Sequence, residues 1–593
     1  MIAPASEPVA PHATDARPDA RPGAEDVAAW RRAVAGSRVR ESWSGRLPPA
    51  EDRLGFRVVV DVGCMGDADA LAAFVDSLRA QILPEWSLVF VRRADASPPD
   101  AEMADVIAHY ARIDGRVSGA VLALMGPQVH KALDPEAAPL TLLVDRPGRL
   151  EPAALAALAE RFAATPTTAL VYADETAEDE ASGPARAHQM LCKQPWDAHL
   201  ALTRDLFGAL KAIRSPLAVN ACVDRESGTG PAWFYAHALR AAEMLRTDQI
   251  RHVAEPLFRR AGDPFPDVAR DAGERAAVQE ALIRRRRAAQ VVAVATGLRR
   301  VVPTPTVWPA VSVIIPTKDK VDFLRRIVTG LLDDTDYPAL DITIIDNRSE
   351  EPETLAYLEA IDAHGDVRIL RIDEPFNFAR LNNLAAARAQ GDVLLFLNND
   401  TEVVHPDWLR EMVAHALRPE VGAVGALLSY PDGRIQHAGV MMGADQGLVG
   451  HLGVLMDDTW IADGPGATER PVSAVTAACL AIRADVYRAM GGFDEAFTVA
   501  YNDVDLCLRL RRAGYAVVWT PGARLVHHES VSRTDDRRSG NRDRAMVEER
   551  GLIARWGVTL QDDPLQPPAF ELATPGWVRG AVPRCPHPWL AAR

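Results

Sequence analysis

The chain lacks most of the features that mark secreted, membrane-spanning or zinc-stapled proteins. Its 593 residues include six cysteines, none of them in a CxxC pair. That spacing excludes a zinc ribbon or a disulfide scaffold and favours a reducing, cytoplasmic compartment. No apolar run reaches about 18 residues, and the N-terminal segment has prolines and acidic residues where a signal peptide needs an apolar core. We therefore expect neither a membrane-spanning helix nor a signal peptide.

Basic residues are also outnumbered by acidic ones. Sixty-six Lys and Arg residues stand against 81 Asp and Glu residues, which gives a net charge of −15. A protein that held nucleic acid by its phosphates would show the opposite balance, so we expect no nucleic-acid partner. Because the chain is too long for one hydrophobic core, we expect two to four domains.

Strand-like and helix-like segments alternate in two blocks of the chain. We predict a disordered tail and lead-in helix at 1–50, a first α/β domain at 51–265, a basic helix and linker at 266–308, a second α/β domain at 309–560 and a Pro-rich tail at 561–593. The basic run Arg284–Arg287 in the linker is either a solvated helix face or a contact with anionic lipid headgroups. The alternation predicts an α/β fold.

The second block contains strands that are apolar on both faces. They lie at 311–315, 342–345, 367–370 and 393–397, with helical spacing between them. Such strands are typical of a parallel sheet with crossover helices. Ligands of these sheets bind beyond the carboxyl ends of the strands, so we expect the polar residues there to form the site.

The first block repeats this layout. Its runs at 57–60 and 87–91 match those at 311 and 341 with one offset of 254 residues, and its run at 140–144 matches 393–397 within one residue. Three strands in matched spacing indicate a duplicated domain. The alternative is that any two α/β domains look alike at this level of detail.

Acidic, amide and imidazole side chains follow the strands of the second block. Asp319 comes after the first strand, Asp346 ends the second and Asn398-Asn399-Asp400 follows the fourth, while a later strand predicted at 516–519 leads to His527. An oxygen-rich set at one rim suits a divalent cation beside a phosphorylated ligand. Mg²⁺ or Mn²⁺ there would neutralise a diphosphate and make it a better leaving group.

Seven sequence words follow one another between residues 311 and 533. They read VSVIIPTKDK, TIIDNRS, FNFARLNNLAAARAQGDVLLFLNNDTEV, SAVTAACLAIR, GGFDEAF, YNDVDLCLRLRRAGY and RLVHHESVSR. In order and spacing they resemble the family 2 glycosyltransferases of the GT-A fold, in particular the bacterial rhamnosyltransferase-like members that build surface polysaccharide. The resemblance implies two tandem GT-A-like domains with mainly parallel central sheets flanked by helices.

The resemblance assigns roles in donor binding. The residues it implies for a nucleotide-diphosphate sugar are Thr317, Asp319, Asp346, Asn382, Asn398 and Asn399. It implies that Asp400 and His527 hold Mn²⁺ or Mg²⁺, with Asn398 in place of the first acid of the family's DxD motif. As alternatives to these binding roles, Asp346 is a helix N-cap and the Asn398–Asp400 run is an Asx-turn. His528 is the neighbour that could exchange roles with His527.

The resemblance also implies an inverting reaction with one catalytic base. Asp503 matches that base, although the family's Glu-Asp pair is Asn502-Asp503 here. The base would take a proton from the acceptor hydroxyl, which then attacks the anomeric carbon. Alternatively Asp503 only caps a helix, and Asp505 competes for the role. Asp494-Glu495 is expected either to contact acceptor hydroxyls or to form a turn, and Gln436–Gly439 resembles an element near the sugar.

The first block has lost the matching residues. Arg92 stands where the offset would place Asp346, and Pro147 stands where Asp400 does once Asp145 is aligned with Asn398. We therefore expect a degenerate GT-A-like domain that positions the acceptor or serves as an interaction surface. The acidic residues that remain near its strand ends are Asp145, Asp174 and Glu175. They leave open the alternative of an active first domain with unusual chemistry.

The hypothesis is an inverting glycosyltransferase in cell-surface polysaccharide (O-antigen or capsule-type) synthesis. Its partners would be a nucleotide-diphosphate sugar and a saccharide or lipid-linked acceptor, and its location the cytoplasm or the inner face of the cell membrane. One alternative is a non-catalytic carbohydrate-binding or scaffold protein. Another is a nucleotidyltransferase, which would need a Gly-rich phosphate loop where the chain has Pro316–Asp319.

Overall fold

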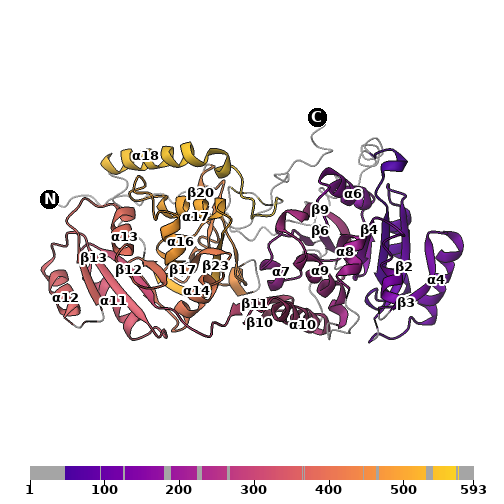
Figure 1. The fold of residues 1–593 in the computed structure, drawn as a ribbon, viewed down its shortest axis with the longest axis horizontal. Helices are drawn as coiled ribbons and strands as arrows, with labels where there is room; N and C mark the ends of the chain where they lie inside the picture. Colours follow the sequence, from indigo (N-terminus) through magenta and orange to yellow (C-terminus); the bar gives the residue numbers. More distant parts are fainter. Residues whose placement is uncertain are drawn as a thin grey trace, which may run out of the picture.

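Two large sheets, each flanked by helices, make up this computed structural model of the chain (Figure 1). The structure describes residues 47–93, 95–124, 127–178, 189–222, 230–262, 268–363, 365, 367–444, 447–462, 466–528, 539–568, 570 and 572. We call residues 56–261 the N-terminal unit and residues 311–560 the C-terminal unit. Almost all of the predicted tail and lead-in helix at 1–50, and most of the Pro-rich tail, lie outside the described residues.

The sheet of the C-terminal unit has the strand order β14-β13-β12-β15-β22-β17-β23-β16. Its strands are β12 (Val311–Thr317), β13 (Leu340–Asp346), β14 (Val367–Arg371), β15 (Val393–Leu397), β16 (Thr401–Val403), β17 (Val421–Ser429), β22 (Cys479–Arg483) and β23 (Ala516–His527). The first four strands of the order are parallel, whereas β22 runs antiparallel to both of its neighbours. The sheet is therefore mixed, and the carboxyl ends of β12, β13 and β15 share one rim.

Helices cover this sheet because their apolar residues recur on one face. In α11, Leu324, Ile327, Val328 and Leu331 are buried, as the helical spacing predicts. The helices of the unit are α11 (Val321–Leu332), α12 (Pro352–Asp362), α13 (Phe378–Ala386), α14 (Trp408–Ala416), α15 (Thr459–Ala462), α16 (Ala484–Ala489), α17 (Asn502–Arg512) and α18 (Ser539–Trp556). Short strands complete it: β18 (Ile435–His437), β19 (Val440–Met442), β20 (Val449–His451) and β21 (Arg470–Pro471).

The N-terminal unit has the same strand order, β3-β2-β1-β4-β8-β6-β9-β5. Its strands are β1 (Phe56–Asp61), β2 (Trp86–Arg92), β3 (Val117–Ala123), β4 (Leu140–Val144), β5 (Gly148–Leu150), β6 (Leu170–Glu178), β7 (Gln189–Leu191), β8 (Leu210–Arg214) and β9 (Ile250–Ala261). Its helices are α3 (Ala68–Arg79), α4 (Ala101–Ile113), α5 (Pro127–Ala132), α6 (Ala154–Ala164), α7 (Leu200–Thr203), α8 (Ser215–Asn220) and α9 (Trp233–Glu243). Each of the eight strands on the path has a counterpart at the same place in the other sheet, which supports a duplication.

The segment between the units holds a helix and a hairpin. Helix α10 (Val268–Arg284) leads into β10 (Ala289–Ala295) and β11 (Leu298–Pro303), so the predicted linker contains a β-hairpin that its turn-rich sequence did not indicate. Strand β11 contacts both units: the Arg299 Nε atom donates to the Leu202 carbonyl at 2.9 Å, and the Val301 amide donates to Glu469 at 2.7 Å. The hairpin thus joins the two units.

The basic run Arg284–Arg287 is engaged in ion pairs. Arg284 lies 2.8 Å from Glu243, and Arg287 lies 2.9 Å from Glu420 of the C-terminal unit. These pairs favour the interpretation as a solvated helix face over a lipid contact. Within the described residues, no helix combines the length and the apolar character needed to cross a bilayer.

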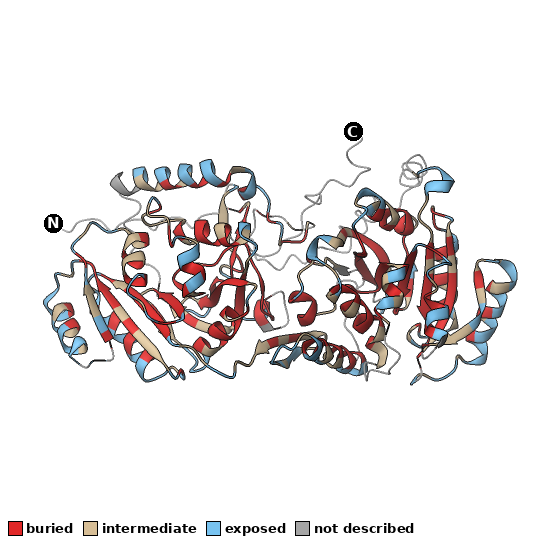
Figure 2. Cartoon of the chain, in the orientation of Figure 1, coloured by how far each residue is buried: buried red, intermediate tan, exposed pale blue. Residues whose placement is uncertain are grey.

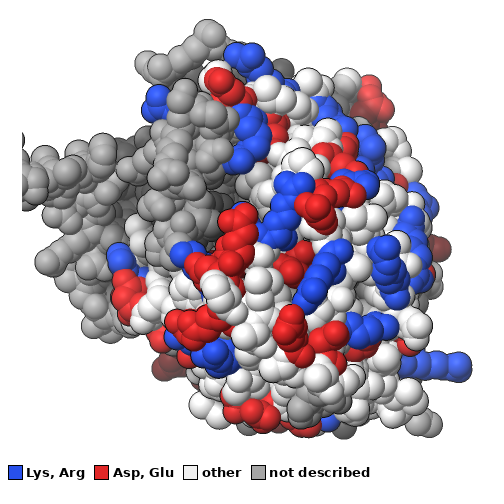
Figure 3. All heavy atoms as spheres, turned by 90° about the vertical axis from the view of Figure 1, so that its left-hand side faces the viewer, with Lys and Arg blue, Asp and Glu red and all other residues white. Residues whose placement is uncertain are grey.

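Burial follows the layers of the fold. The central strands of both sheets are buried, whereas the outer helices α4 and α12 are largely exposed (Figure 2). On the face that Figure 3 shows, Lys and Arg side chains are interspersed with Asp and Glu.

Candidate functional site

The turn after β15 and the end of β23 bring Asp400 and His527 together. Thr401 pairs with His527 across the antiparallel strands β16 and β23, which places the preceding aspartate beside the imidazole. The Asp400 Oδ1 and His527 Nε2 atoms lie 3.1 Å apart, and the Asn398 amide nitrogen lies 3.4 Å from the same Nε2. Burial opposes the ionisation of Asp400, but the hydrogen bond and charge of His527 outweigh it and hold its pKa below the ordinary range.

The other ring nitrogen of His527 contacts Gln436. The His527 Nδ1 and Gln436 Oε1 atoms lie 2.6 Å apart, and the His527 side chain is buried. A proton on Nδ1 donates to the amide oxygen and fixes the ring with its Nε2 atom toward Asp400. The sequence resemblance placed Gln436 near the sugar but did not reveal this contact, because β18 and β23 are far apart in the chain.

His528 points to a different partner. Its Nε2 atom lies 2.8 Å from a Glu402 carboxylate oxygen and 2.9 Å from the Arg326 guanidinium. Only its backbone contacts the site, because the His528 amide donates to the Asp400 carbonyl. The arrangement therefore favours His527 over His528 as the residue beside Asp400.

Two donor-site candidates join the ends of β12 and β15. The Asn399 amide donates to the Thr317 hydroxyl at 2.9 Å. Asp319 accepts from the backbone amides of Glu350 and Glu351, at 2.7 and 2.8 Å, so its carboxylate holds the segment that leads into α12.

Asp346 is buried and accepts from the Ser349 amide at 3.0 Å. Because α12 begins at Pro352 after Glu351, Asp346 closes a turn and is not the helix N-cap. Asn382 is also buried and donates to the Phe378 carbonyl of its own helix at 2.8 Å, which leaves its Oδ1 atom without a hydrogen-bond partner among the described residues. Both roles in donor binding stay predictions.

Asp503 lies in the first turn of α17, beside the loop that precedes β22. Its Oδ2 atom accepts from the Ala477 amide at 3.0 Å. The next residue of that loop, Ala478, accepts from the Asn398 amide at 3.0 Å. The candidate base and the residues after β15 therefore contact adjacent residues of one loop. Helix α17 begins at Asn502, so Asp503 is not its N-cap.

Asp505 has a structural role. Its side chain is fully buried and accepts from Arg509 at 2.7 Å, Arg555 at 2.8 Å and the Trp556 indole at 3.0 Å. A carboxylate enclosed by three donors cannot reach an acceptor hydroxyl, so the geometry favours Asp503 as the base candidate.

The acceptor candidates lie in a braced loop. Asp494 closes a turn by accepting from the Ala496 amide and pairs with Arg555 of α18 at 2.6 Å. Glu495 accepts from Asn383 of α13 at 3.1 Å. Both carboxylates keep some exposure, so a turn and an acceptor contact are compatible.

The matching rim of the N-terminal unit carries different chemistry. Gly148 pairs with Arg260 as Thr401 pairs with His527, so Pro147 and Arg260 are the counterparts of Asp400 and His527. The remaining acids are all engaged with basic groups. Asp145 pairs with Lys211, Asp174 with His252, and Glu175 with Lys193, at 2.9, 2.7 and 2.5 Å. These pairs disfavour an active first unit.

The residues around Asp400 suit a divalent cation that takes further ligands from a phosphate. In the described part of the chain, no three His, Cys, Asp or Glu side chains gather at one point. A carboxylate and an imidazole nitrogen at 3.1 Å form two adjacent ligands, and Mn²⁺ accepts both types. The remaining positions would be filled by diphosphate oxygens and water.

Comparison with known proteins matches this unit to a family. The model of "Glycosyl transferase family 2" matches residues 312–442, and that of "Glycosyl transferase family group 2" matches residues 393–561. The C-terminal unit thus matches the models of glycosyltransferase family 2, as the sequence words indicated.

Several curated proteins are similar in sequence to this chain. The chain is 34% identical over 585 residues to the uncharacterized protein y4gI of Sinorhizobium fredii, covering 91% of this chain and 61% of that protein. It is 36% identical over 489 residues to the O-antigen biosynthesis protein RfbC of Myxococcus xanthus, covering 79% of this chain and 37% of that protein. It thus spans between about a third and two thirds of the lengths of these relatives.

Two further similarities cover smaller shares of the chain. An N-acetylglucosaminyl-diphospho-decaprenol L-rhamnosyltransferase of Mycobacterium tuberculosis is 31% identical over 128 residues, 20% of this chain and 41% of that protein. A solved structure of GalNAc-T7 with UDP, GalNAc and Mn²⁺ has a TM-score of 0.33 at 16% identity, over 38% of this chain and 44% of that one.

Proposed function

We propose that the protein is an inverting glycosyltransferase that moves a sugar from a nucleotide-diphosphate donor to a hydroxyl of a saccharide or lipid-linked acceptor. The observation that carries the proposal is the meeting of two groups at one loop. Asp503 accepts from the Ala477 amide, and the segment that holds Asp400 donates to Ala478. This puts a base candidate close to a phosphate-binding candidate, as direct displacement requires.

In the proposed reaction, Asp503 takes the proton of the acceptor hydroxyl as its oxygen attacks the anomeric carbon. The bond between that carbon and the diphosphate breaks, and inversion follows because the attack comes from the opposite face. Asp503 is half-buried and faces backbone amides, so its carboxylate has a fixed direction. One base is enough, because no sugar–enzyme intermediate forms.

Asp400 and His527 would hold Mn²⁺ or Mg²⁺, with Gln436 fixing the imidazole. When bound, the cation supplies positive charge for the leaving diphosphate. Thr317, Asn399 and Asp346 would contact the nucleotide or the sugar. Asp494 and Glu495 would orient the acceptor.

Two relatives support a role in surface polysaccharide. One is named for O-antigen biosynthesis and the other for rhamnosyl transfer to a diphospho-decaprenol acceptor. An acceptor of that kind would bring the protein to the inner face of the cell membrane from the cytoplasm. The first domain, with proposed bounds 51–265, contains the N-terminal unit. It would position the acceptor and take no part in the chemical step.

A donor screen tests the proposal. The whole chain is mixed with UDP-, dTDP- and GDP-sugars, with Mn²⁺, Mg²⁺ or EDTA, and nucleotide release is measured. We expect one donor class to be hydrolysed slowly with metal and at least tenfold less with EDTA. If no donor is bound or hydrolysed with either metal, the non-catalytic carbohydrate-binding alternative replaces this proposal.

A further inference from the structure

The N-terminal unit contains a cavity of about 200 Å³ on the side of its sheet where the C-terminal unit has its phosphate-binding candidates. Three guanidinium groups line it: Arg146 from the turn between β4 and β5, Arg204 from the end of α7, and Arg260 from β9. The turn of the β10–β11 hairpin also borders the cavity.

The strand register relates this cavity to the Asp400 site. Arg260 pairs with Gly148 as His527 pairs with Thr401. Arg146 directly precedes Pro147, just as Asn399 directly precedes Asp400. Two permanent cations thus stand at the positions where the other unit has an amide and a metal-ligand candidate.

Arg204 adds a third cation to the lining of the cavity. Its Nη2 atom donates to the Thr468 hydroxyl at 2.8 Å, and among the described residues it forms no ion pair with a carboxylate. Burial and the nearby charge of Arg299 lower its pKa to about 10, although the charge of Glu469 acts in the opposite direction. The Arg204 Nε atom has no hydrogen-bond partner among the described residues, so a phosphate oxygen in the cavity would satisfy it.

Two further side chains have polar atoms that need a ligand. Arg146 and Gln194 both line the cavity and are 8% and 5% exposed. The Arg146 Nε and Gln194 Oε1 atoms have no hydrogen-bond partner among the described residues. The Arg146 Nε–H group can donate to a phosphate oxygen, whereas the Gln194 Oε1 atom is an acceptor that water or a ligand hydroxyl would satisfy.

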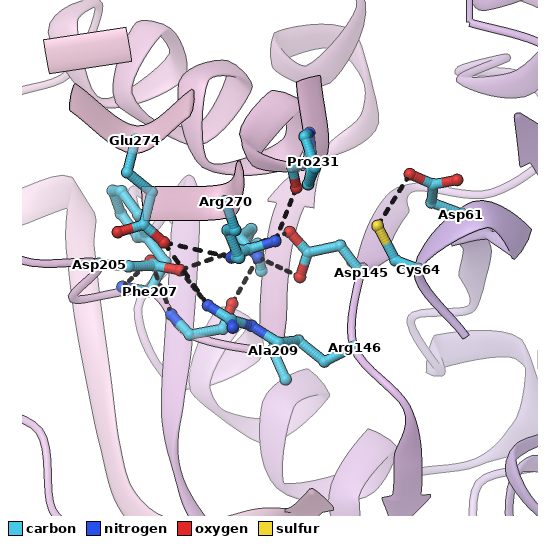
Figure 4. Close-up of polar contacts among 12 residues, drawn as sticks. Asp61, Cys64, Asp145, Arg146, Asp205, Phe207, Ala209, Pro231, Arg270 and Glu274 are labelled. Atoms are coloured by element: carbon cyan, nitrogen blue, oxygen red, sulfur yellow. Dashed lines mark hydrogen bonds and ion pairs between the residues drawn. The ribbon is translucent and has the colours of Figure 1, made fainter. Parts of the chain in front are cut away.

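The nearby carboxylates are already engaged. Figure 4 shows Arg270 of α10 between Asp145, Asp205 and Glu274, at 3.0, 3.2 and 3.2 Å. Lys211 holds Asp145 from the other side. Asp205 and Glu274 also line the cavity and pair with Arg146 at 3.3 and 3.7 Å. Because Arg146 and Arg270 share these acids, neither acid forms an ion pair with Arg204.

We propose that this cavity binds the phosphate or diphosphate group of a small or lipid-linked ester without a metal ion. The guanidinium groups of Arg146 and Arg204 supply the positive charge and the donors that phosphate oxygens accept. Binding here involves no bond breakage, and the inference stands independently of the transfer reaction proposed for the other unit.

Titration calorimetry with inorganic pyrophosphate in EDTA tests the inference on the whole chain. We expect one site per chain in the unmodified protein. Arg146→Gln and Arg204→Gln should each weaken binding about tenfold or more, the loss expected for a charged hydrogen bond. Gln194→Glu, which keeps the side-chain shape and adds a negative charge, should abolish binding. Arg112→Gln on the exposed face of α4 and Asp400→Ala in the other unit should leave it unchanged.

The outcomes separate the two units. Absence of pyrophosphate binding in EDTA overturns the inference, as does binding that survives all three cavity variants. Binding lost in Asp400→Ala would place the ligand in the C-terminal unit and also overturn it. Thermal melting identifies any variant that fails to fold, and Gln194→Glu then decides. Displacement by UDP assigns a nucleotide ligand, and retention on vesicles that contain a polyprenyl diphosphate assigns a lipid.

Discussion

In the C-terminal unit, the turn after β15 sets Asn398 and Asp400 beside His527; in the N-terminal unit, the corresponding turn sets Asp145 beside Lys211 and Arg270. Both turns end strands at the same place in sheets of the same order. The first arrangement leaves a carboxylate and an imidazole for a cation, whereas the second satisfies its carboxylate with the chain's own cations. The fold is thus separable from the chemistry that its rim performs.

Replacing the candidate base should give the largest effect. We expect Asp503→Asn to lower the transfer rate by roughly 10²–10⁴-fold, the usual contribution of general base catalysis, and to leave donor affinity within about twofold. Initial rates and donor binding measured on the same preparation check this. The control is Asp485→Asn, an exposed aspartate of α16. Transfer at the normal rate by Asp503→Asn would refute the base assignment.

The ion-pair cluster of the N-terminal unit should matter for stability. Arg270→Gln leaves Asp145, Asp205 and Glu274 short of a buried cation, so we expect a loss of about 3–5 kcal/mol in the free energy of unfolding. Urea unfolding measures it. Arg112→Gln on the surface of α4 should change it by less than about 0.5 kcal/mol. Equal losses in the two variants would mean that the cluster is not structural.

The contact between Gln436 and His527 should tune metal binding. Gln436→Leu removes the acceptor of the Nδ1 proton, so we expect Mn²⁺ affinity to fall by about 10–100-fold. Electron paramagnetic resonance of free Mn²⁺ measures this without turnover. Gln561→Leu, at an exposed position, is the control. An unchanged Mn²⁺ affinity in Gln436→Leu would show that Gln436 does not support metal binding by His527.

The junction between the units should give the most gradual effect, spread over more than two pH units. His199 of the N-terminal unit contacts Glu469 of the C-terminal unit at 3.0 Å. Burial and the charge of Arg418 lower the pKa of His199 from its ordinary value of 6.5 to about 4. The pKa of His199 is lower in the folded chain than in the unfolded chain, so folding favours the neutral imidazole. The contribution of His199 to the free energy of unfolding is therefore complete above pH 6.5. It is lost as the pH falls toward 4, by at most about 1.4 kcal/mol per pH unit.

Unfolding experiments across that pH window check the junction. His199→Asn should flatten the profile between pH 6.5 and 4, and His109→Asn, on the surface of α4, should not. A profile that keeps its slope in His199→Asn would assign the titration to another group.

The sequence predicted the regular part of the fold well. The bounds of β15 coincide with the predicted strand at 393–397 because its apolar run is undisturbed. Strand β23 runs on past Pro521 and Gly522 to His527, whereas the predicted strand ends at Trp519. The register shift opposite Ala426 and Leu427 explains the difference, because a bulge accommodates both residues within a strand.

The site could be predicted only where its residues follow strand ends. Asp400 and His527 were found in that way, and the structure brings them to 3.1 Å. Arg270 could not be found, because it reaches Asp145 across 125 residues from a helix placed outside the first domain. Tertiary partners of that kind leave no local pattern.

The most direct test of the difference between the units is anomalous diffraction at the manganese edge from crystals grown with Mn²⁺ and the donor found in the screen. We predict one strong peak between Asp400 and His527, about 2.2 Å from both, and none beside Arg146. A peak in the N-terminal unit, or none near Asp400 with the nucleotide in place, would contradict the assignment of the chemistry to the C-terminal unit.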